Sequence, residues 1–234
     1  MIVLYDYNGT LVNSKEIIFQ CDAQVRRNLD YPLIEPGVYF SAYQSNWRQM
    51  YADLGIRPEA IDRYIQEFKS VYSSARAPRW VPGAVPLLKA MGRHSFGLLT
   101  DSPLEAVAPR LITFGLEFLL GNVDTSHGDK ANGLYHAASE HTDDTVIYVA
   151  DTVSDGLAVL RARQMGAKNL HYCAMRNQYA FSPASQMVQF FNDHQHASWL
   201  MSHRDLRVLK QDLRITVSIG HIYKDGFVSA AMPD

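Results

Sequence analysis

The chain has little of what marks secreted, membrane-spanning or zinc-binding proteins. It contains two cysteines in 234 residues, and Cys21 and Cys173 form neither a CxxC pair nor a metal-binding spacing. No run of about 18 apolar residues occurs, so we expect no membrane-spanning helix. The first ten residues have no basic stretch followed by an apolar one, so we expect no secretory signal. These absences favour a protein of the reducing cytoplasm.

The chain also lacks an excess of charge of either sign. It carries 22 Lys and Arg against 24 Asp and Glu, a formal net charge of -2. Such a balance gives no long-range attraction to a polyanion, so we expect no nucleic-acid partner. Repeats and low-complexity tracts are absent, and hydrophobic residues make up 47% of the chain, as in ordinary globular proteins. The length predicts one large domain, or one domain with a smaller insert.

Short apolar runs alternate with helical patterns along most of the chain. The runs at 1–5, 95–100, 145–150 and 169–173 show no polar alternation, which indicates strands buried on both faces of a sheet. The segments between them carry apolar residues at helical spacing. This order predicts an α/β fold with a Rossmann-like, three-layer parallel-sheet core and helices on both faces.

A helical insert separates the first two predicted strands. Helices are predicted over 14–31, 38–54 and 58–77, with no good strand among them. We therefore expect residues 14–80 to form a separate α-helical cap domain.

The remaining segments complete the predicted domain organisation. Residues 1–13 and 81–213 are expected to form the α/β core, with a helix over 205–213 near its end. Residues 214–234 have the pattern of a β-hairpin and are expected to form a C-terminal extension. An exposed strand edge there can pair between subunits, so a homodimer through this extension is one expectation.

Polar residues follow three of the predicted strands directly. Asp6 follows the first strand, Thr100 the second, and Asp151 with Asp155 the third, whereas Lys130 lies in a predicted loop. The carboxyl ends of parallel strands share one edge of a sheet, where ligands bind. A single Asp in such a place is more often a turn residue, but the set in this order predicts a site. Clustered carboxylates of this kind suit Mg²⁺.

The segments around these residues resemble four motifs of the haloacid dehalogenase superfamily. DYNGTLV at 6–12 is similar to the first motif, DxDGTL; FGLLT at 96–100 to the second; Lys130 to the third-motif lysine; and YVADTVSD at 148–155 to the fourth, GDxxxD. VPGAVPLLK at 81–89 resembles the segment by which such chains return from a helical cap. The resemblance covers residues 1 to about 213, and the chain is similar to phosphoglycolate phosphatase-like members.

This resemblance implies a phosphatase that acts on a small phosphorylated metabolite. It makes Asp6 the nucleophile that forms an aspartyl-phosphate. It assigns Mg²⁺ to Asp6, the backbone carbonyl of Asn8 and Asp151, with Asp155 as a further ligand or as an orienting group.

The resemblance also assigns the residues that bind the phosphoryl group. Thr100 donates its hydroxyl, Lys130 neutralises charge, and the amides around Tyr7 and Asn8 hold phosphoryl oxygens. An anionic side chain beside a phosphate is repelled by it, so we expect Asp101 to point away from the site. In the cap, Trp47 and Arg48 are the residues that we expect to face the substrate.

Position 8 departs from the phosphatase pattern. The family normally carries Asp there, which protonates the leaving group and then deprotonates water, whereas an Asn amide cannot transfer a proton at neutral pH. Three alternatives follow. Asn8 is an engineered or tolerated change in a phosphatase of low activity; or the protein binds phosphate compounds without hydrolysing them; or it is a phosphotransferase or acyl-phosphate enzyme that needs no leaving-group acid.

Overall fold

The computed structural model describes most of the chain, namely residues 1–44, 46–91, 96–124, 129–175, 178–194 and 199–201. The predicted helix over 205–213 and the extension 214–234, with its edge for a homodimer, lie outside these residues. In the described ranges, every helix is too short or too polar to cross a membrane.

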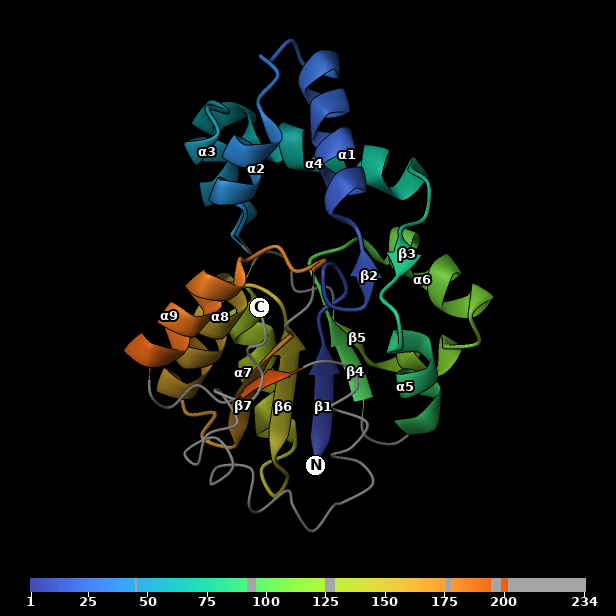
Figure 1. Ribbon diagram of the computed structural model, residues 1–234, viewed down its shortest axis with the longest axis vertical. Helices are drawn as coiled ribbons and strands as arrows, with labels where there is room; N and C mark the ends of the chain where they lie inside the picture. The colour runs from blue at the N-terminus through green and yellow to red at the C-terminus, as the bar shows by residue number, and fades with distance from the viewer. Residues whose placement is uncertain (45, 92–95, 125–128, 176–177, 195–198, 202–234) are drawn as a thin grey trace.

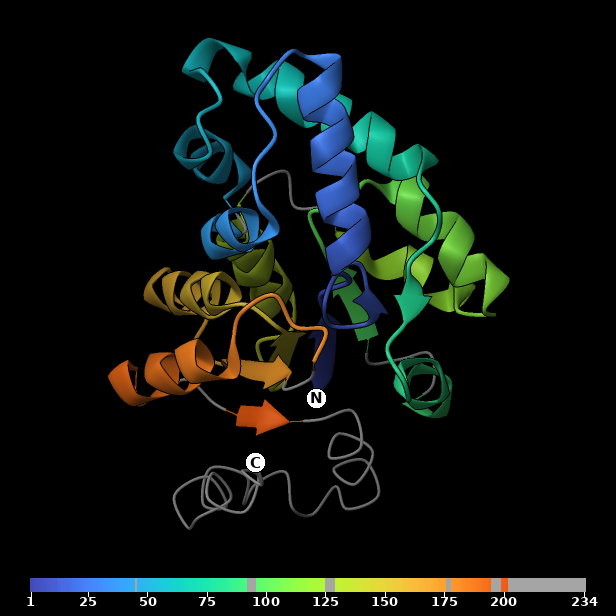
Figure 2. The same ribbon diagram turned by 45° about the horizontal axis from the view of Figure 1, so that its top comes forward.

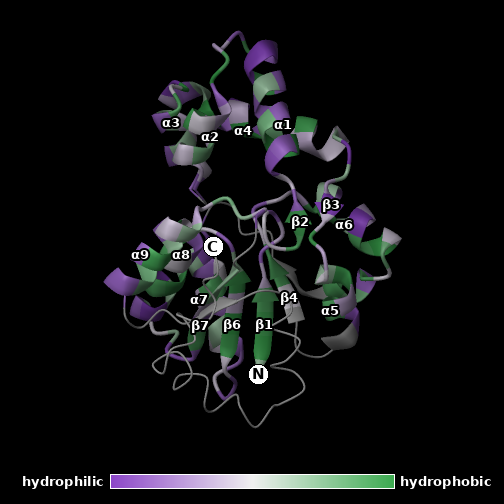
Figure 3. Cartoon of the chain, in the orientation of Figure 1, coloured by the Kyte–Doolittle hydropathy of each residue, from purple (hydrophilic) through white to green (hydrophobic). Residues whose placement is uncertain are grey.

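Six parallel strands form the central sheet (Figure 1). In spatial order they are β5 (Val123–Asp124), β4 (Phe96–Leu99), β1 (Ile2–Tyr5), β6 (Val146–Ala150), β7 (Leu170–Met175) and β8 (Trp199–Met201). Figure 3 shows that β1 and β6 are apolar along their length, as buried parallel strands are. Because β1 lies between β4 and β6, the residue that follows it stands in the middle of the carboxyl edge.

Helices cover both faces of this sheet. On one face lie α5 (Ala84–Met91) and α6 (Leu104–Thr113), and on the other lie α7 (Lys130–Glu140), α8 (Val153–Gln164) and α9 (Ala184–Asp193). Tyr5 and Val149 pack on the first face, whereas their neighbours Leu4 and Tyr148 pack on the second. This alternation gives the three layers, so the predicted Rossmann-like α/β fold is confirmed.

Four further helices lie beyond the carboxyl ends of the strands (Figures 1 and 2). They are α1 (Lys15–Asn28), α2 (Pro36–Ala42), α3 (Trp47–Asp53) and α4 (Ile61–Ser74), with a 3-10 turn, η1 (Pro58–Ala60), before α4. We call α1 to α4 the cap helices. Their apolar side chains form one cluster, which Ala106 of α6 and Phe181 also join. The chain leaves the core through β2 (Val12–Asn13) and returns through β3 (Arg79–Trp80), which pair antiparallel.

The single helix predicted over 38–54 is wrong, since α2 and α3 occupy this segment. The backbone is extended at Tyr43, which ends α2. Asn46 then caps α3, because its side-chain oxygen accepts the amide of Gln49 at 3.2 Å.

Lys130 also differs from its predicted place in a loop, because it is the first residue of α7. The Asp129 side chain caps this helix by accepting the amide of Ala131 at 3.1 Å. A helix start constrains the lysine backbone more tightly than a loop does.

Candidate active site

The ends of β1 and β6 bring three carboxylates together. Asp6 follows β1, Asp151 follows β6, and Asp155 lies in the first turn of α8. All three are buried, and one carboxylate oxygen of each lies within 4.8 Å of the others. The sheet topology therefore assembles residues that are separated by almost 150 positions in the sequence.

Lys130 reaches this cluster from the neighbouring helix. Its Nζ lies 3.2 Å from Asp6 Oδ1 and 2.7 Å from Asp155 Oδ1, and the lysine side chain is buried. Asp101, expected to point away, instead faces the site, with a carboxylate oxygen 3.7 Å from the same Nζ. The expectation for Asp101 is wrong because this buried ammonium attracts the nearby carboxylate.

Asp151 is held in place from two sides. Its Oδ1 accepts the Thr10 hydroxyl at 3.1 Å, and its Oδ2 accepts the backbone N–H of Phe181 at 2.6 Å. Gly9, with φ +73°, allows the loop after β1 to pass over this carboxylate: a Cβ on Gly9 would lie 2.2 Å from Asp151 Oδ2.

Asp155 is part of a helix cap as well as of the carboxylate cluster. Its Oδ2 accepts the Thr152 hydroxyl at 2.5 Å and the Thr152 amide at 3.3 Å, and the Thr152 hydroxyl accepts the Asp155 amide in return. This capping box starts α8. One carboxylate oxygen of Asp155 thus positions the helix while the other binds Lys130.

The electrostatics of the cluster suit a divalent cation. Burial raises the pKa of Asp6 to about 6. The negative charge of Asp155 also raises this pKa, whereas the positive charge of Lys130 lowers it. Burial and the charges of Asp6 and Asp155 raise the pKa of Asp151 well above its usual range. Burial lowers the pKa of Lys130, but Asp155 and Asp6 outweigh burial and keep it charged. One ammonium cannot balance three carboxylates, so a hard cation fits between them.

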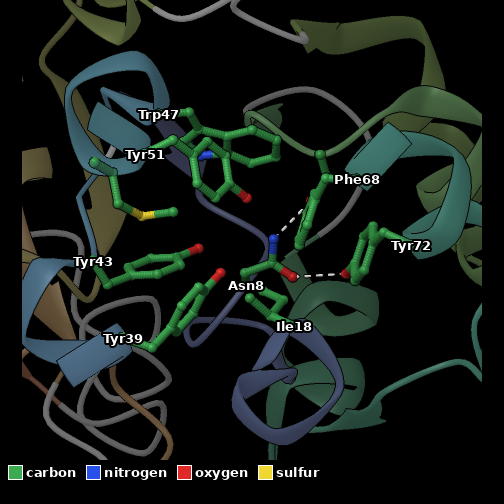
Figure 4. A pocket seen from close by; sticks show the side chains of 10 residues that line it. Asn8, Ile18, Tyr39, Tyr43, Trp47, Tyr51, Phe68 and Tyr72 are labelled. Atoms are coloured by element: carbon green, nitrogen blue, oxygen red, sulfur yellow. Dashed lines mark hydrogen bonds between the residues drawn. The ribbon is translucent and has the colours of Figure 1, made fainter. Parts of the chain in front are cut away.

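The Asn8 side chain lies among side chains of the cap helices (Figure 4). Its Nδ2 donates to the Ser102 hydroxyl at 2.7 Å, and its Oδ1 accepts the hydroxyl of Tyr72, from α4, at 2.9 Å. Arg110 of α6 donates to the same tyrosine hydroxyl at 3.3 Å. Both ends of the amide are therefore engaged, and the residue joins the loop after β1 to a cap helix.

A narrow pocket with about 20 Å³ of free space opens over Asp6, and we call it the catalytic pocket. Thr100, fully buried at the end of β4, lines it together with Lys130 and Asp155. Trp47 lines the side that faces the cap helices.

Arg48 stands further out than Trp47. It lines a larger, open cleft of about 1020 Å³ between the cap helices and the core, and its guanidinium pairs with the exposed Asp62. Trp47 lines this cleft as well, so of the two cap residues named from the sequence Trp47 lines both spaces and Arg48 lines the outer cleft.

Sequence patterns alone missed several residues of the site. Thr10 and Phe181 hold Asp151, and Ser102, Tyr72 and Arg110 surround Asn8. Thr10 lies in the first motif and Thr152 has the spacing of a capping box, so the sequence could have pointed to both residues. Tyr72 and Arg110 carried no such signal, because their proximity to Asn8 depends on how α4 and α6 pack.

Comparisons with known proteins identify the family and the fold of the chain. A family model described as haloacid dehalogenase-like hydrolase matches residues 3–170. A predicted phosphatase from Clostridium acetobutylicum shares the fold with a TM-score of 0.69 and 16% identity, over 91% of this chain and 98% of that one. A predicted phosphoglycolate phosphatase from Haemophilus somnus gives a TM-score of 0.67 and 14% identity, over 89% and 97%.

A hydrolase of the same family from Deinococcus radiodurans, solved with bound phosphate and sodium, gives a TM-score of 0.58 and 17% identity, over 93% of this chain and 96% of that one. At these identities the likeness shows the fold alone. No curated protein sequence matches the chain. The family model spans the β1 loop, the end of β4, Lys130 and the β6 loop. The chain therefore belongs to the haloacid dehalogenase-like hydrolase family.

Proposed function

We propose that the protein is a Mg²⁺-dependent phosphatase for a small phosphorylated metabolite and that it acts through an aspartyl-phosphate on Asp6. The observation that carries this proposal is the buried position of Asp6 beside Lys130 Nζ, at 3.2 Å, in a pocket that Thr100 also lines. A carboxylate nucleophile and an anionic phosphoryl group repel each other, and a buried ammonium between them offsets that repulsion.

The reaction divides into two displacements at phosphorus. First, an Asp6 oxygen bonds to phosphorus while the bond from phosphorus to the ester oxygen breaks, and the leaving alkoxide takes a proton from solvent. Water then attacks phosphorus and gives a proton to solvent, the bond to Asp6 breaks, and inorganic phosphate is released. Thr100 donates to a phosphoryl oxygen, and Lys130 balances negative charge throughout.

We expect Asp6, the backbone carbonyl of Asn8 and Asp151 to hold the Mg²⁺, with Asp155 as a further ligand or as the group that orients Lys130. When bound, the ion neutralises charge on the transferring phosphoryl group. The amides of Tyr7 and Asn8 complete the set that we expect to bind phosphoryl oxygens.

Asn8 limits the first displacement. Its amide has no proton to give to a leaving alkoxide, and its two ends are already bound to Ser102 and Tyr72. We therefore expect slow turnover of alkyl phosphates and faster turnover of esters whose alcohol leaves without a proton.

The variant Asn8→Asp tests this proposal. The Ser102 and Tyr72 hydroxyls can both donate to a carboxylate, so the fold should accept the change. We expect hydrolysis of an alkyl phosphate in Mg²⁺ to rise about 100-fold, and hydrolysis of p-nitrophenyl phosphate to rise much less, because restoring a general acid matters most for a poor leaving group. Steady-state phosphate release measures both rates, and Asp6→Asn is the inactive control.

A second candidate is a protein that binds phosphate compounds with little or no turnover. The engaged amide of Asn8 favours it, because nothing at this position is free to act as an acid. Binding of beryllium fluoride in Mg²⁺, with no turnover of p-nitrophenyl phosphate, alkyl phosphate or acetyl phosphate by the wild type or Asn8→Asp, would favour this candidate. If acetyl phosphate alone is turned over, the acyl-phosphate alternative is the better one.

A further inference from the structure

A second, narrower space opens behind Asn8, and we call it the inner pocket. It lies between the cap helices and the loop after β1. Six aromatic side chains line it: Tyr39, Tyr43, Trp47, Tyr51, Phe68 and Tyr72. Asn8, Tyr43 and Trp47 also line the catalytic pocket, so the two spaces share a wall.

The position of this space suits the alcohol part of a phosphate ester. A phosphoryl group at Asp6 directs its ester oxygen towards position 8, where the family places the acid that meets the leaving group. The inner pocket continues from that position. Its crevices are narrower than a water molecule, so an alcohol enters only when the cap side chains shift.

We propose that the inner pocket selects phosphate monoesters of small, uncharged, hydroxylated alcohols and rejects esters that carry a carboxylate. This inference rests on the proposed phosphatase function and names its substrate class.

The lack of charge in the lining supports the rejection of carboxylates. None of the described residues that line the inner pocket is charged. The Arg110 guanidinium reaches the Tyr72 hydroxyl but does not line the space. A carboxylate placed there would lose its hydration without gaining an ionic partner, which is costly. It would also lie near the acidic cluster of Asp6, Asp151 and Asp155.

Tyrosine hydroxyls support the selection of hydroxylated alcohols. Figure 4 shows the hydroxyl ends of Tyr39, Tyr43 and Tyr51 pointing into the space beside Asn8. Tyr39 is fully buried, and its hydroxyl lies near that of Tyr51 without forming a hydrogen bond of ordinary geometry among the residues that the structure describes. Burial raises the pKa of all three well above 10, so they are neutral hydrogen-bonding groups. A substrate hydroxyl would give the Tyr39 hydroxyl a hydrogen bond of better geometry.

Binding to the Asp6→Asn variant, in which turnover is blocked, tests the selection. The probes are glycerol 3-phosphate, 3-phosphoglycerate, which has a carboxylate in place of the terminal CH₂OH, and propyl phosphate, which has no hydroxyl. With Mg²⁺ present, calorimetry should give glycerol 3-phosphate a Kd at least about 10-fold lower than that of either other ester. Tighter binding of 3-phosphoglycerate would overturn the inference while leaving the phosphatase proposal intact.

The variant Tyr39→Phe, in the same Asp6→Asn background, tests the hydroxyl itself. It should raise the Kd for glycerol 3-phosphate about 10-fold relative to propyl phosphate, because one hydrogen bond is lost. It should change the urea midpoint little, since the removed hydroxyl makes no hydrogen bond of ordinary geometry in the described structure. Tyr31→Phe is the matched control: that hydroxyl, beside Arg57, is also buried without a hydrogen bond of ordinary geometry but does not line the inner pocket, so the ratio of the two Kd values should stay unchanged.

Two other outcomes decide the inference. An unchanged ratio of the two Kd values in Tyr39→Phe would overturn the role of the tyrosine hydroxyl. If neither inorganic phosphate nor any ester binds, while the variant remains folded, the proposed function fails and this inference fails with it.

Discussion

Gly9 is the residue at which the first motif comes closest to the carboxylate cluster. A methyl group at this position would lie 2.2 Å from Asp151 Oδ2 and 2.8 Å from the Phe181 ring, and the backbone has φ +73°. We expect Gly9→Ala to displace Asp151, abolish Mg²⁺-dependent phosphate release, and destabilise the fold by more than the roughly 1–2 kcal/mol of left-handed strain. Urea unfolding and phosphate-release assays measure the two effects.

Gly55 is the matched control for this prediction. Its φ is +82°, but a methyl group placed there would have no atom within 4 Å. Gly55→Ala should therefore cost only the strain, roughly 1–2 kcal/mol, and leave the rate of phosphate release unchanged. Equal loss of activity in the two variants would show that strain, and not the contact with Asp151, is what matters at Gly9.

Among the elements, α4 shows how one helix serves both the cap and the site. Tyr64, Phe68 and Tyr72 follow one another at i, i+4 spacing and so share a face. Tyr64 donates to Asp22 of α1 at 2.7 Å, Phe68 lines the inner pocket, and Tyr72 donates to Asn8. A change in the position of α4 would therefore move both the inner pocket and the Asn8 amide.

Strand β7 carries a half-buried titrating group, His171. Burial, together with the charge of Arg163, lowers the pKa of His171 below its ordinary value. The unfolded chain then binds a proton more readily than the folded chain does, so the free energy of unfolding falls as pH drops through about 6.5. Urea unfolding at a series of pH values should show a smaller fall in His171→Gln than in the wild type.

The exposed His136 of α7 provides the comparison for this pH dependence. The substitution His136→Gln should leave the fall of the free energy of unfolding at lower pH the same as in the wild type. If His171→Gln shows the same slope as the wild type, the loss of stability at lower pH arises from other groups.

For the whole molecule, we expect metal binding to be coupled to folding. Asp6 and Asp151 follow different strands, so a cation bound to both stabilises the folded chain only. At a Mg²⁺ concentration 100 times the Kd, linkage predicts about 2.7 kcal/mol of added stability. Thermal unfolding in Mg²⁺ and in EDTA should show the shift for the wild type, and Asp151→Asn should abolish it.

Asp144→Asn controls for the loss of an acidic residue elsewhere. Asp144 pairs with the N-terminal ammonium at 2.6 Å, at the start of β1 and away from the carboxylate cluster. This variant should keep the full Mg²⁺ shift. A shift that survives in Asp151→Asn would place the cation elsewhere.

The sequence by itself determined the architecture of the core. Uninterrupted apolar runs can be buried only between two layers of helices, so their order predicted the parallel sheet, and the residues after the runs predicted one shared edge. It also showed the Asn at position 8 that separates this chain from the usual phosphatase pattern. The sequence did not predict the break between α2 and α3, because Asn46 acts as a helix cap only once the backbone turns at Tyr43.

Only the tertiary structure decided what surrounds the predicted residues. Asp101 faces Lys130 and not solvent, and Tyr72 reaches Asn8 from 64 residues away. The roles of Asp6, Lys130 and Asp155 stay predictions, but the distances between them follow from strand order. Cap contacts such as the Tyr39 hydroxyl beside Asn8 depend on helix packing, which is set by many weak apolar contacts at once. A linear motif does not encode those contacts, and this is why the substrate end of the site became visible only in three dimensions.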